Sequence, residues 1–168
     1  VLKMGDIADS QVILGGQKTV PPNTSGLPDL FLDEGDLLYN RTNSAELVGK
    51  TGLFDGPSRT YTFASYLIRI RFPTALVEPK FINMCMNSPF FRKTQIEPRL
   101  KQQCGQANVN GATMRNMEVP LPPYSEQRRI IRKVEELMGL CDAIKARIDG
   151  AKATLIHLAD AVVEHVVQ

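Results

Sequence analysis

The sequence predicts an α+β (α/β) domain with a small mixed sheet, followed by one long C-terminal coiled-coil helix. Three observations lead to this prediction: strand-like alternation with turn signals over residues 36–72, proline-initiated helical stretches over residues 78–98, and a heptad-like periodicity in the last quarter. The 168 residues are 43% hydrophobic, which suffices for one ordinary core plus an extension. We therefore place the domain at residues 1–123 and the helix at residues 124–168.

Apolar residues in the last quarter recur at alternating steps of four and three, which keeps them in one narrow stripe along a helix. The stripe comprises Ile130, Val134, Leu137, Cys141, Ile144, Ile148, Ala151, Leu155, Leu158, Val162 and His165, and all of these except Ala151 and His165 form the predicted assembly seam. A helix over about residues 125–167 would be roughly 60 Å long, more than a domain of this size needs for its own core. We expect this seam to pack against a partner helix, with an antiparallel homodimer as the arrangement of the isolated chain.

Three strands are expected in the domain, at residues 36–41, 48–54 and 60–72. The first follows the turn signal Asp33-Glu-Gly35, and a polar loop joins it to the second, so the two read as a hairpin-like pair. In the third strand the even positions read as the core face. This choice places Arg69 and Arg71 on the other side of the sheet.

Prolines mark the helical part of the domain. Glu78-Pro79 opens one helix, and Pro89 opens another that carries the basic pair Arg92-Lys93 and is limited by Pro98. The remaining segments are a polar loop at residues 101–111, a short strand at residues 117–121 and an N-cap at Ser125 for the long helix.

The net charge of +2 is unevenly distributed along the chain. Residues 1–36 have a net charge of −4, whereas residues 37–71 have +3 and residues 80–120 have +4. The positive and negative charges of residues 121–168 cancel, which is typical of a solvated coiled coil. A phosphate-binding surface is therefore expected in the middle of the chain and not on the long helix.

The cysteines and histidines indicate neither a disulfide framework nor a metal site. Cys85, Cys104 and Cys141 show no CxxC spacing, so we interpret them as buried free thiols in a reducing cytoplasm. His157 and His165 both lie on the long helix, which argues against a shared metal ion. No glycine-rich loop follows a strand and no apolar run of about 18 residues occurs, so we expect no cofactor and no membrane segment.

Two stretches carry a resemblance to a known family. One is Gly35-Asp-Leu-Leu-Tyr-Asn-Arg41 followed by Leu47-Val-Gly-Lys50, and the other runs from Asn108-Val-Asn-Gly111 through Met117-Glu-Val-Pro-Leu-Pro-Pro-Tyr-Ser-Glu-Gln-Arg-Arg-Ile130 into the heptad helix. Together they resemble the specificity (S) subunit of type I restriction-modification systems. The resemblance covers the chain from about Gly35 onward, and Pro-Pro-x-x-Glu-Gln-x-x-Ile is its more specific motif.

The resemblance implies a target-recognition domain that reads one half of a bipartite site on double-stranded DNA, followed by a helix of the conserved spacer region. In that family two such helices pair antiparallel, methyltransferase (M) subunits dock nearby, and the restriction (R) subunit completes the enzyme. The specificity subunit itself does no chemistry, so no catalytic residue is assigned. The resemblance also implies that this chain lacks the start of the recognition domain and one of two halves, as expected of a fragment or a half subunit.

Polar and basic residues near the ends of the predicted strands are the candidate DNA contacts. They are Arg41, Thr42, Asn43, Ser44, Lys50, Arg92, Lys93, Lys101, Gln102 and Gln106. Arginine and lysine would contact phosphates, whereas asparagine, glutamine and arginine would read base edges. Residues 41–44 are preferred because a strand end presents an adaptable loop on a rigid support, residues 101–106 come second, and Arg92-Lys93 third.

Two other functions fit the same sequence. The chain is alternatively the C-terminal specificity region of a single-chain methyltransferase-nuclease, or a coiled-coil interaction scaffold that does not bind DNA. Leu121-Pro-Pro-Tyr124 resembles the Asn/Asp-Pro-Pro-Tyr motif of amino-methyltransferases, but a leucine has no oxygen to accept a hydrogen bond from the target amino group. The chain itself is therefore not expected to be a methyltransferase.

Overall fold

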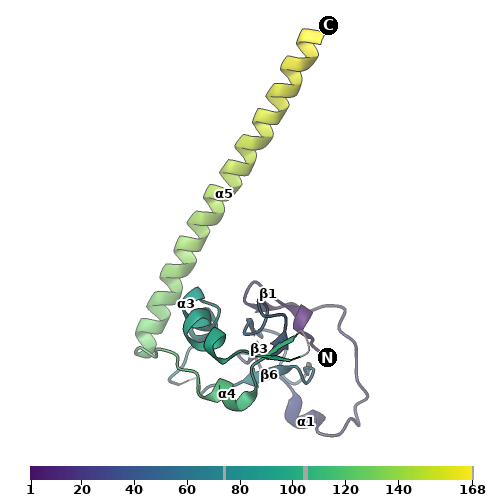
Figure 1. Cartoon of the computed structure of the whole chain (residues 1–168), viewed down its shortest axis with the longest axis vertical. Helices are drawn as coiled ribbons and strands as arrows, with labels where there is room; N and C mark the ends of the chain where they lie inside the picture. The colour runs from purple at the N-terminus through teal and green to yellow at the C-terminus, as the bar shows by residue number, and fades with distance from the viewer. Residues whose placement is uncertain (74, 104–105, 168) are drawn as a thin grey trace. The chain divides into compact units, whose positions relative to one another are not determined.

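The computed structural model describes residues 1–73, 75–103 and 106–167, with side chains over these ranges except at 102, 103, 106 and 160–167. The chain divides into two compact units, Val1–Arg128 and Arg129–Gln168, which are described separately. Figure 1 follows the elements from the purple N-terminus to helix α5 (Tyr124–Val167), which runs from green to yellow at the C-terminal end. The predicted α+β class, with a small mixed sheet and a long C-terminal helix, is confirmed.

A five-stranded sheet forms the centre of the first unit. Its strands, in spatial order, are β1 (Ile7–Ala8), β2 (Gln11–Val12), β5 (Thr51–Leu53), β3 (Leu37–Asn40) and β6 (Leu67–Ile70). The β2–β5 pair is parallel and the other pairs are antiparallel, so the sheet is mixed. Leu38 of β3 pairs with Gly52 of β5 on one side and with Arg69 of β6 on the other. The predicted hairpin-like pair, now β3 and β5, is confirmed.

The hydrophobic core lies around β3, where all four residues are buried. The core cluster consists of Leu2, Ile7, Val12, Leu32, Leu38, Phe54 and Leu67. Burial of this kind stabilises the domain by about 1.5–3 kcal/mol for each large apolar side chain. The continuous run Leu37-Leu-Tyr39 therefore fixes β3 as the strand about which the other segments are arranged.

A second, three-stranded sheet contains segments that the sequence analysis assigned to loops. Its order is β4 (Thr42–Asn43), β8 (Gln106–Asn108) and β7 (Lys101–Gln103), and both pairings are antiparallel. The prediction of a loop at residues 101–111 is wrong, because Lys101–Gln103 forms β7, Gln106–Asn108 forms β8 and Gly111 begins α4 (Gly111–Arg115). Polar strands such as these give no apolar alternation. Among the residues of β8 and its continuation whose side chains are described, Ala107 and Val109 are buried.

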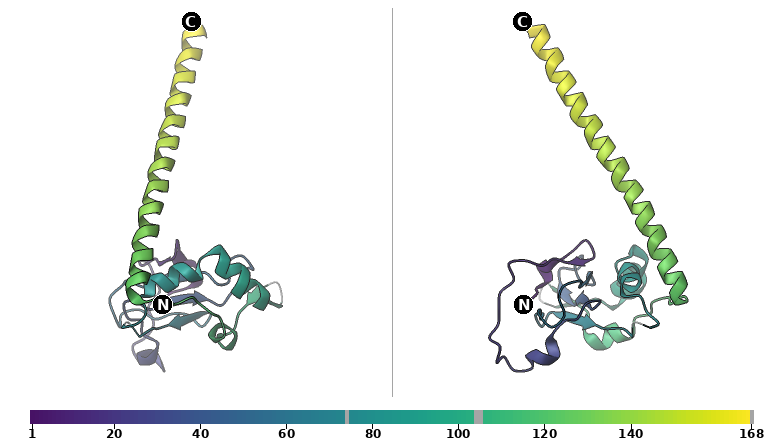
Figure 2. Two further views of the ribbon diagram at one scale, coloured as in Figure 1. Left: turned by 90° about the vertical axis from the view of Figure 1, so that its left-hand side faces the viewer. Right: turned by 180° about the vertical axis from the view of Figure 1, so that it is seen from behind.

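The remaining helices of the first unit are short. They are η1 (Met4–Asp6), α1 (Leu27–Leu30), α2 (Pro79–Met86), α3 (Pro89–Phe91), the π-helical η2 (Arg92–Ile96) and the 3-10 turn η3 (Glu97–Arg99). The helices predicted to begin at Pro79 and Pro89 are confirmed. Buried Phe81, Ile82 and Met86 pack α2 against β5, and both views of Figure 2 show the teal α2–α3 segment beside the strands.

Three local predictions are corrected. The strand expected at residues 60–72 is reduced to β6 (Leu67–Ile70). The even positions were predicted to face the core, but the odd-numbered Leu67 is buried there, whereas Ile68 and Ile70 are only partly buried. Residues 117–121 form no strand. The helix begins at Tyr124, and the Pro123 carbonyl accepts the first helical hydrogen bonds, so Ser125 is not the N-cap.

The second unit is a single helix. Its large apolar side chains are exposed from Leu137 to Leu158, whereas Ile131 is buried and the seam residues Ile130 and Val134 are partly buried. Seam residues Leu137, Ile144 and Leu155 are 49%, 57% and 69% exposed. Cys141 is also exposed and Cys85 is half-buried, so the prediction of buried thiols is wrong for Cys141, whereas Cys104 lies outside the described residues. The side chains of Val162 and His165 also lie outside them. Within the described ranges no helix is long and apolar enough to cross a membrane.

Candidate functional site

The second sheet places two of the predicted DNA-binding segments side by side. Thr42 and Asn43 of β4 pair with Asn108 and Ala107 of β8, and Lys101 pairs with Asn108 from the other edge. The two segments are almost 60 residues apart in the sequence, so only the tertiary fold makes them neighbours. The side chains of Gln102 and Gln106 lie outside the described residues, although their backbone belongs to the same sheet.

Arg41 connects this sheet to the five-stranded one. Its backbone N–H donates to the Tyr66 carbonyl at 3.1 Å, and its carbonyl accepts from the Val109 N–H at 2.9 Å. The Nε of Arg41 and the Oδ1 atoms of Asn40 and Asn108 are buried, and no partner for them occurs among the described residues. Buried polar atoms are nearly always hydrogen-bonded in folded proteins, so this junction contains polar groups that a bound molecule or solvent can complete.

A tight turn follows β4 and carries the other preferred candidates. The Asn43 Oδ1 accepts from the Ser44 N–H at 2.8 Å, and the Ser44 carbonyl accepts from the N–H groups of Leu47 and Val48, both at 3.0 Å. The Gly49 N–H then donates to the Asn40 carbonyl at 2.9 Å, which closes the turn on the end of β3. Ser44 and Lys50 are exposed on this turn, so they are accessible to a ligand.

Arg92 contacts this turn from η2. Its Nη1 donates to the Val48 carbonyl at 3.1 Å, its Nη2 donates to the Ala45 carbonyl, and its Nε lies 3.6 Å from the Glu97 carboxylate. The neighbouring Lys93 is exposed. The two members of the predicted basic pair therefore have different surroundings, because the guanidinium of Arg92 is held by protein groups and Lys93 faces solvent.

The charge of Arg92 also influences two ionisable neighbours. Burial raises the pKa of Tyr39 above its ordinary value, and the positive charge of Arg92 opposes this shift. Hydrogen bonds from its own backbone and from Ser44 lower the pKa of Glu46, and Arg92 lowers it further. Glu46 is consequently a carboxylate at neutral pH, which reduces the positive potential of the turn.

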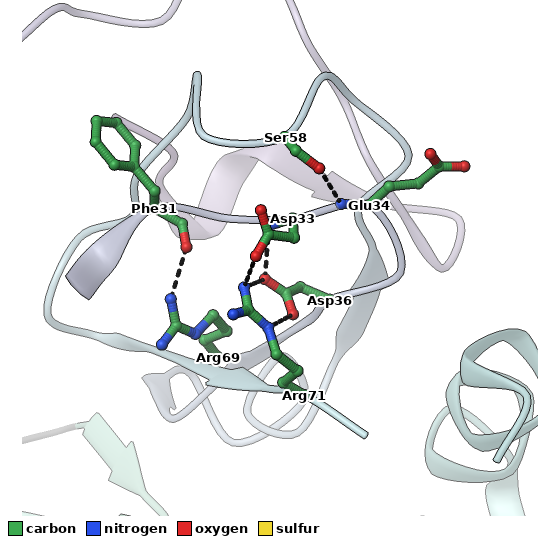
Figure 3. Close-up of polar contacts among 7 residues, drawn as sticks. All are labelled: Phe31, Asp33, Glu34, Asp36, Ser58, Arg69 and Arg71. Carbon is green, nitrogen blue, oxygen red and sulfur yellow. Dashed lines mark hydrogen bonds and ion pairs between the residues drawn. The ribbon is translucent and has the colours of Figure 1, made fainter. Parts of the chain in front are cut away.

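Two arginines that contribute to the positive charge of residues 37–71 bind partners within the domain (Figure 3). Arg71 binds Asp36 through two hydrogen bonds of 2.6 Å and lies 2.8 Å from Asp33, and these contacts with Asp36 raise the pKa of its guanidinium. Arg69 donates to the Phe31 carbonyl at 2.6 Å. The acidic N-terminal segment thus supplies partners for the basic one, and the positive surface is smaller than the charge count of residues 37–71 indicates.

Gln127 has a structural role that the sequence analysis did not assign. Its side chain is 0% exposed, its Oε1 accepts from the Glu78 N–H at 2.9 Å, and its Nε2 donates to the carbonyls of Leu76 and Pro122 at 3.0 and 2.8 Å. It therefore anchors the first turn of α5 to the start of α2. The signal was present in the sequence, because Gln127 belongs to the Pro-Pro-x-x-Glu-Gln motif.

The start of the same quoted stretch, Asn108-Val-Asn-Gly111, also has a structural role. Asn110 caps α4 by accepting from the Thr113 N–H at 2.8 Å, and Gly111 is the first residue of that helix.

Residues 29–151 match the family model described as "Type I restriction modification DNA specificity domain". The chain belongs to this specificity family.

Curated relatives of the specificity family match over a limited part of their own length. The chain is 32% identical over 133 residues to the type I restriction enzyme EcoKI specificity subunit of Escherichia coli (strain K12), which is 78% of this chain and 28% of the relative. It is 25% identical over 147 residues to the EcoEI specificity subunit of Escherichia coli, 88% of this chain and 25% of that protein. The chain therefore spans about a quarter of the length of these relatives.

Solved structures show the same fold. The HsdS subunit from Thermoanaerobacter tengcongensis matches with a TM-score of 0.66 at 21% identity, over 85% of this chain and 36% of that one. A chain from a structure titled for complex assembly and conformational transition of the type I R-M system matches with a TM-score of 0.64 at 22% identity, over 86% of this chain and 36% of that one. At these identities the likeness concerns the fold alone.

Metal chemistry finds no support at the candidate site. In the part of the chain that the structure describes, no group of three or more histidine, cysteine, aspartate or glutamate side chains is gathered closely enough to hold a metal ion. The described side chains of the sheet include the Thr42 hydroxyl, the Asn43 amide and the exposed Lys101 ammonium group.

Proposed function

We propose that this chain reads one half of a bipartite site on double-stranded DNA, as a half or fragment of a type I restriction-modification specificity subunit. The observation that supports this proposal most directly is the pairing of the central strand β8 with β4 on one side and with β7 on the other. This pairing brings the backbone of Thr42–Asn43 into the same sheet as Lys101–Gln103 and Gln106–Asn108, and we propose that the side chains of these strands share one DNA-reading surface. The chain itself is proposed to be non-catalytic.

Different side chains have different proposed roles in that surface. Arg41, Lys50, Lys93 and Lys101 neutralise phosphates, and this contribution to affinity decreases as salt increases. Thr42, Asn43, Ser44, Gln102 and Gln106 read base edges through hydrogen bonds. In Asn43 the Oδ1 already accepts from the Ser44 N–H, so the amide Nδ2 is the group left to donate to a base.

The long helix is proposed to assemble the complex. Its exposed seam would pack against a second specificity half or a second copy of the chain, while M subunits and the R subunit join the complex and DNA lies on the recognition domain. The exposure of Leu137, Ile144 and Ile148 supports this role, because such a row of large apolar side chains is stabilised by a partner helix. The expected cytoplasmic location stays a prediction.

Selection of bound sequences from a randomised duplex pool tests the DNA-reading proposal. We expect enrichment of a short half-site that persists as salt is raised, with this chain alone or with its M subunit. The double change Arg41→Ala, Asn43→Ala should then weaken binding to the selected site by about 2 kcal/mol or more, since it removes the phosphate contact of Arg41 and the base contact of Asn43. The exposed Lys152→Ala on α5 is the matched control and should leave affinity unchanged.

Two outcomes would contradict the proposal. If the double variant binds the selected site as the wild type does, residues 41 and 43 do not belong to the reading surface. If neither sample binds DNA at any salt concentration, the alternative of a coiled-coil scaffold is favoured.

A further inference from the structure

Two carbonyls of the turn at residues 44–49 accept hydrogen bonds from a distant side chain. The Ser44 and Leu47 carbonyls accept from N–H groups within the turn and at Lys50. The carbonyls of Ala45 and Val48 instead accept from the guanidinium of Arg92, which is more than 40 residues further along the chain. The shape of the turn therefore depends on a side chain from η2.

Arg92 is itself oriented by its neighbours. Its Nε lies 3.6 Å from Oε1 of Glu97, and the side chain is 30% exposed. A guanidinium donates in several fixed directions from one planar group, so it is suited to hold two carbonyls and a carboxylate at once. A lysine has the same charge but is a compact ammonium group on a flexible stem, which cannot reproduce this fork.

A second contact links the same segment to the turn. Gly49 has φ +91°, and a Cβ at this position would collide with Cδ1 of Ile96, the last residue of η2. Ile96 is buried, so it cannot move away easily. The π-helical segment thus supports the turn at both ends, through Arg92 at Ala45 and Val48 and through Ile96 at Gly49.

The turn at residues 44–49 also fixes the end of the proposed reading strand, β4. It begins directly after β4 with the hydrogen bond between Asn43 and Ser44, and it ends where Gly49 bonds to Asn40. We infer that Arg92 is a positioning residue that holds this turn, and with it Asn43 and Ser44, in the geometry for base recognition, and that it is not itself a DNA contact. This inference rests on the proposed function.

Binding measurements on four variants test the inference. Arg92→Ala and Arg92→Lys remove the fork, Gly49→Ala displaces the turn without changing charge, and Lys93→Ala is the matched loss of a neighbouring exposed cation. Affinities for the selected half-site and for a scrambled duplex are measured over a range of salt concentrations. The fraction of binding-competent protein is measured by stoichiometric titration with duplex, and urea unfolding shows that each variant is folded.

We expect both Arg92 variants and Gly49→Ala to lower the ratio of specific to non-specific affinity by about tenfold or more, which is the size of one mismatched base pair. Their salt dependence should stay that of the wild type, because no phosphate contact is lost. Lys93→Ala should weaken binding to both duplexes and reduce the salt slope by about one.

A DNA-free measurement separates this inference from the proposed function. Arg92→Ala should speed hydrogen exchange at the Val48 and Gly49 amides by about tenfold in the free protein, because the turn loses two charge-assisted hydrogen bonds. The inference is overturned if exchange is unchanged, or if Arg92→Lys restores wild-type discrimination while Arg92→Ala reduces the salt slope. A wild-type chain that prefers no sequence would instead remove the proposed function, and the exchange result would still decide whether Arg92 holds the turn.

Discussion

Replacing Gln127 by alanine tests how the first turn of α5 is attached to its own unit. The side chain is fully buried and makes three hydrogen bonds, one accepted from the Glu78 N–H and two donated to the carbonyls of Leu76 and Pro122. At about 1 kcal/mol for each bond, the variant loses about 3 kcal/mol of unfolding free energy. The groups left unpaired in a buried place make this a lower estimate.

Urea unfolding followed by tyrosine fluorescence measures this loss. The chain has four tyrosines and no tryptophan, and Tyr39, Tyr61, Tyr66 and Tyr124 all lie in the unit Val1–Arg128, so the signal reports that unit alone. With an m-value of about 2 kcal/mol/M, the midpoint should fall by about 1.5 M. Ser125→Ala, an exposed change in the same helical turn, is the control and should shift it very little.

A charged analogue sharpens the test. Gln127→Glu keeps the acceptor for the Glu78 N–H but places a carboxylate beside two carbonyls, which raises the pKa of the introduced group. Its folded state is then favoured below the ordinary glutamate pKa of about 4.3 and loses this advantage as pH rises. We expect a larger loss at pH 7 than at pH 5. A midpoint for Gln127→Ala that equals that of Ser125→Ala would refute the anchoring role.

Three further outcomes are expected. The double change Leu137→Asp, Ile144→Asp should abolish self-association or M-subunit docking, as measured by sedimentation velocity. The control Leu140→Asp, Ile156→Asp makes the same type of change outside the seam and should affect association less. Equal effects would contradict the seam. Burial raises the pKa of the Cys85 thiol, so alkylation at pH 7.5 should be slower at Cys85 than at exposed Cys141, as read by peptide mass mapping, and equal rates would contradict its burial. Asp36→Asn should lower the unfolding free energy by about 2 kcal/mol, because it breaks the ion pair with half-exposed Arg71 that is made by two hydrogen bonds. In the same urea assay the control Asp55→Asn, at an exposed residue, should leave the unfolding free energy nearly unchanged.

Local patterns in the sequence were sufficient to predict the elements that have a clear apolar pattern or a proline signal. The run Leu37-Leu-Tyr39 between turn signals predicted the central strand, Glu78-Pro79 predicted the start of α2, and the four-three spacing predicted α5. Each of these signals depends on the order of residues that are neighbours in the sequence. Such an order is written in the sequence itself.

Only the tertiary structure decided which distant segments meet. The pairing of Thr42–Asn43 with Gln106–Asn108 joins backbone N–H and carbonyl groups, which every residue except proline provides, so no side-chain pattern announces it. The same is true of polar partners: Arg71 was counted as surface charge and binds Asp36, and Arg92 was predicted to contact DNA and binds Ala45 and Val48. The sequence determined which side chains this protein has for recognition, whereas the fold determined which of them are already bound within it, because hydrogen-bond partners depend on distance and direction in space.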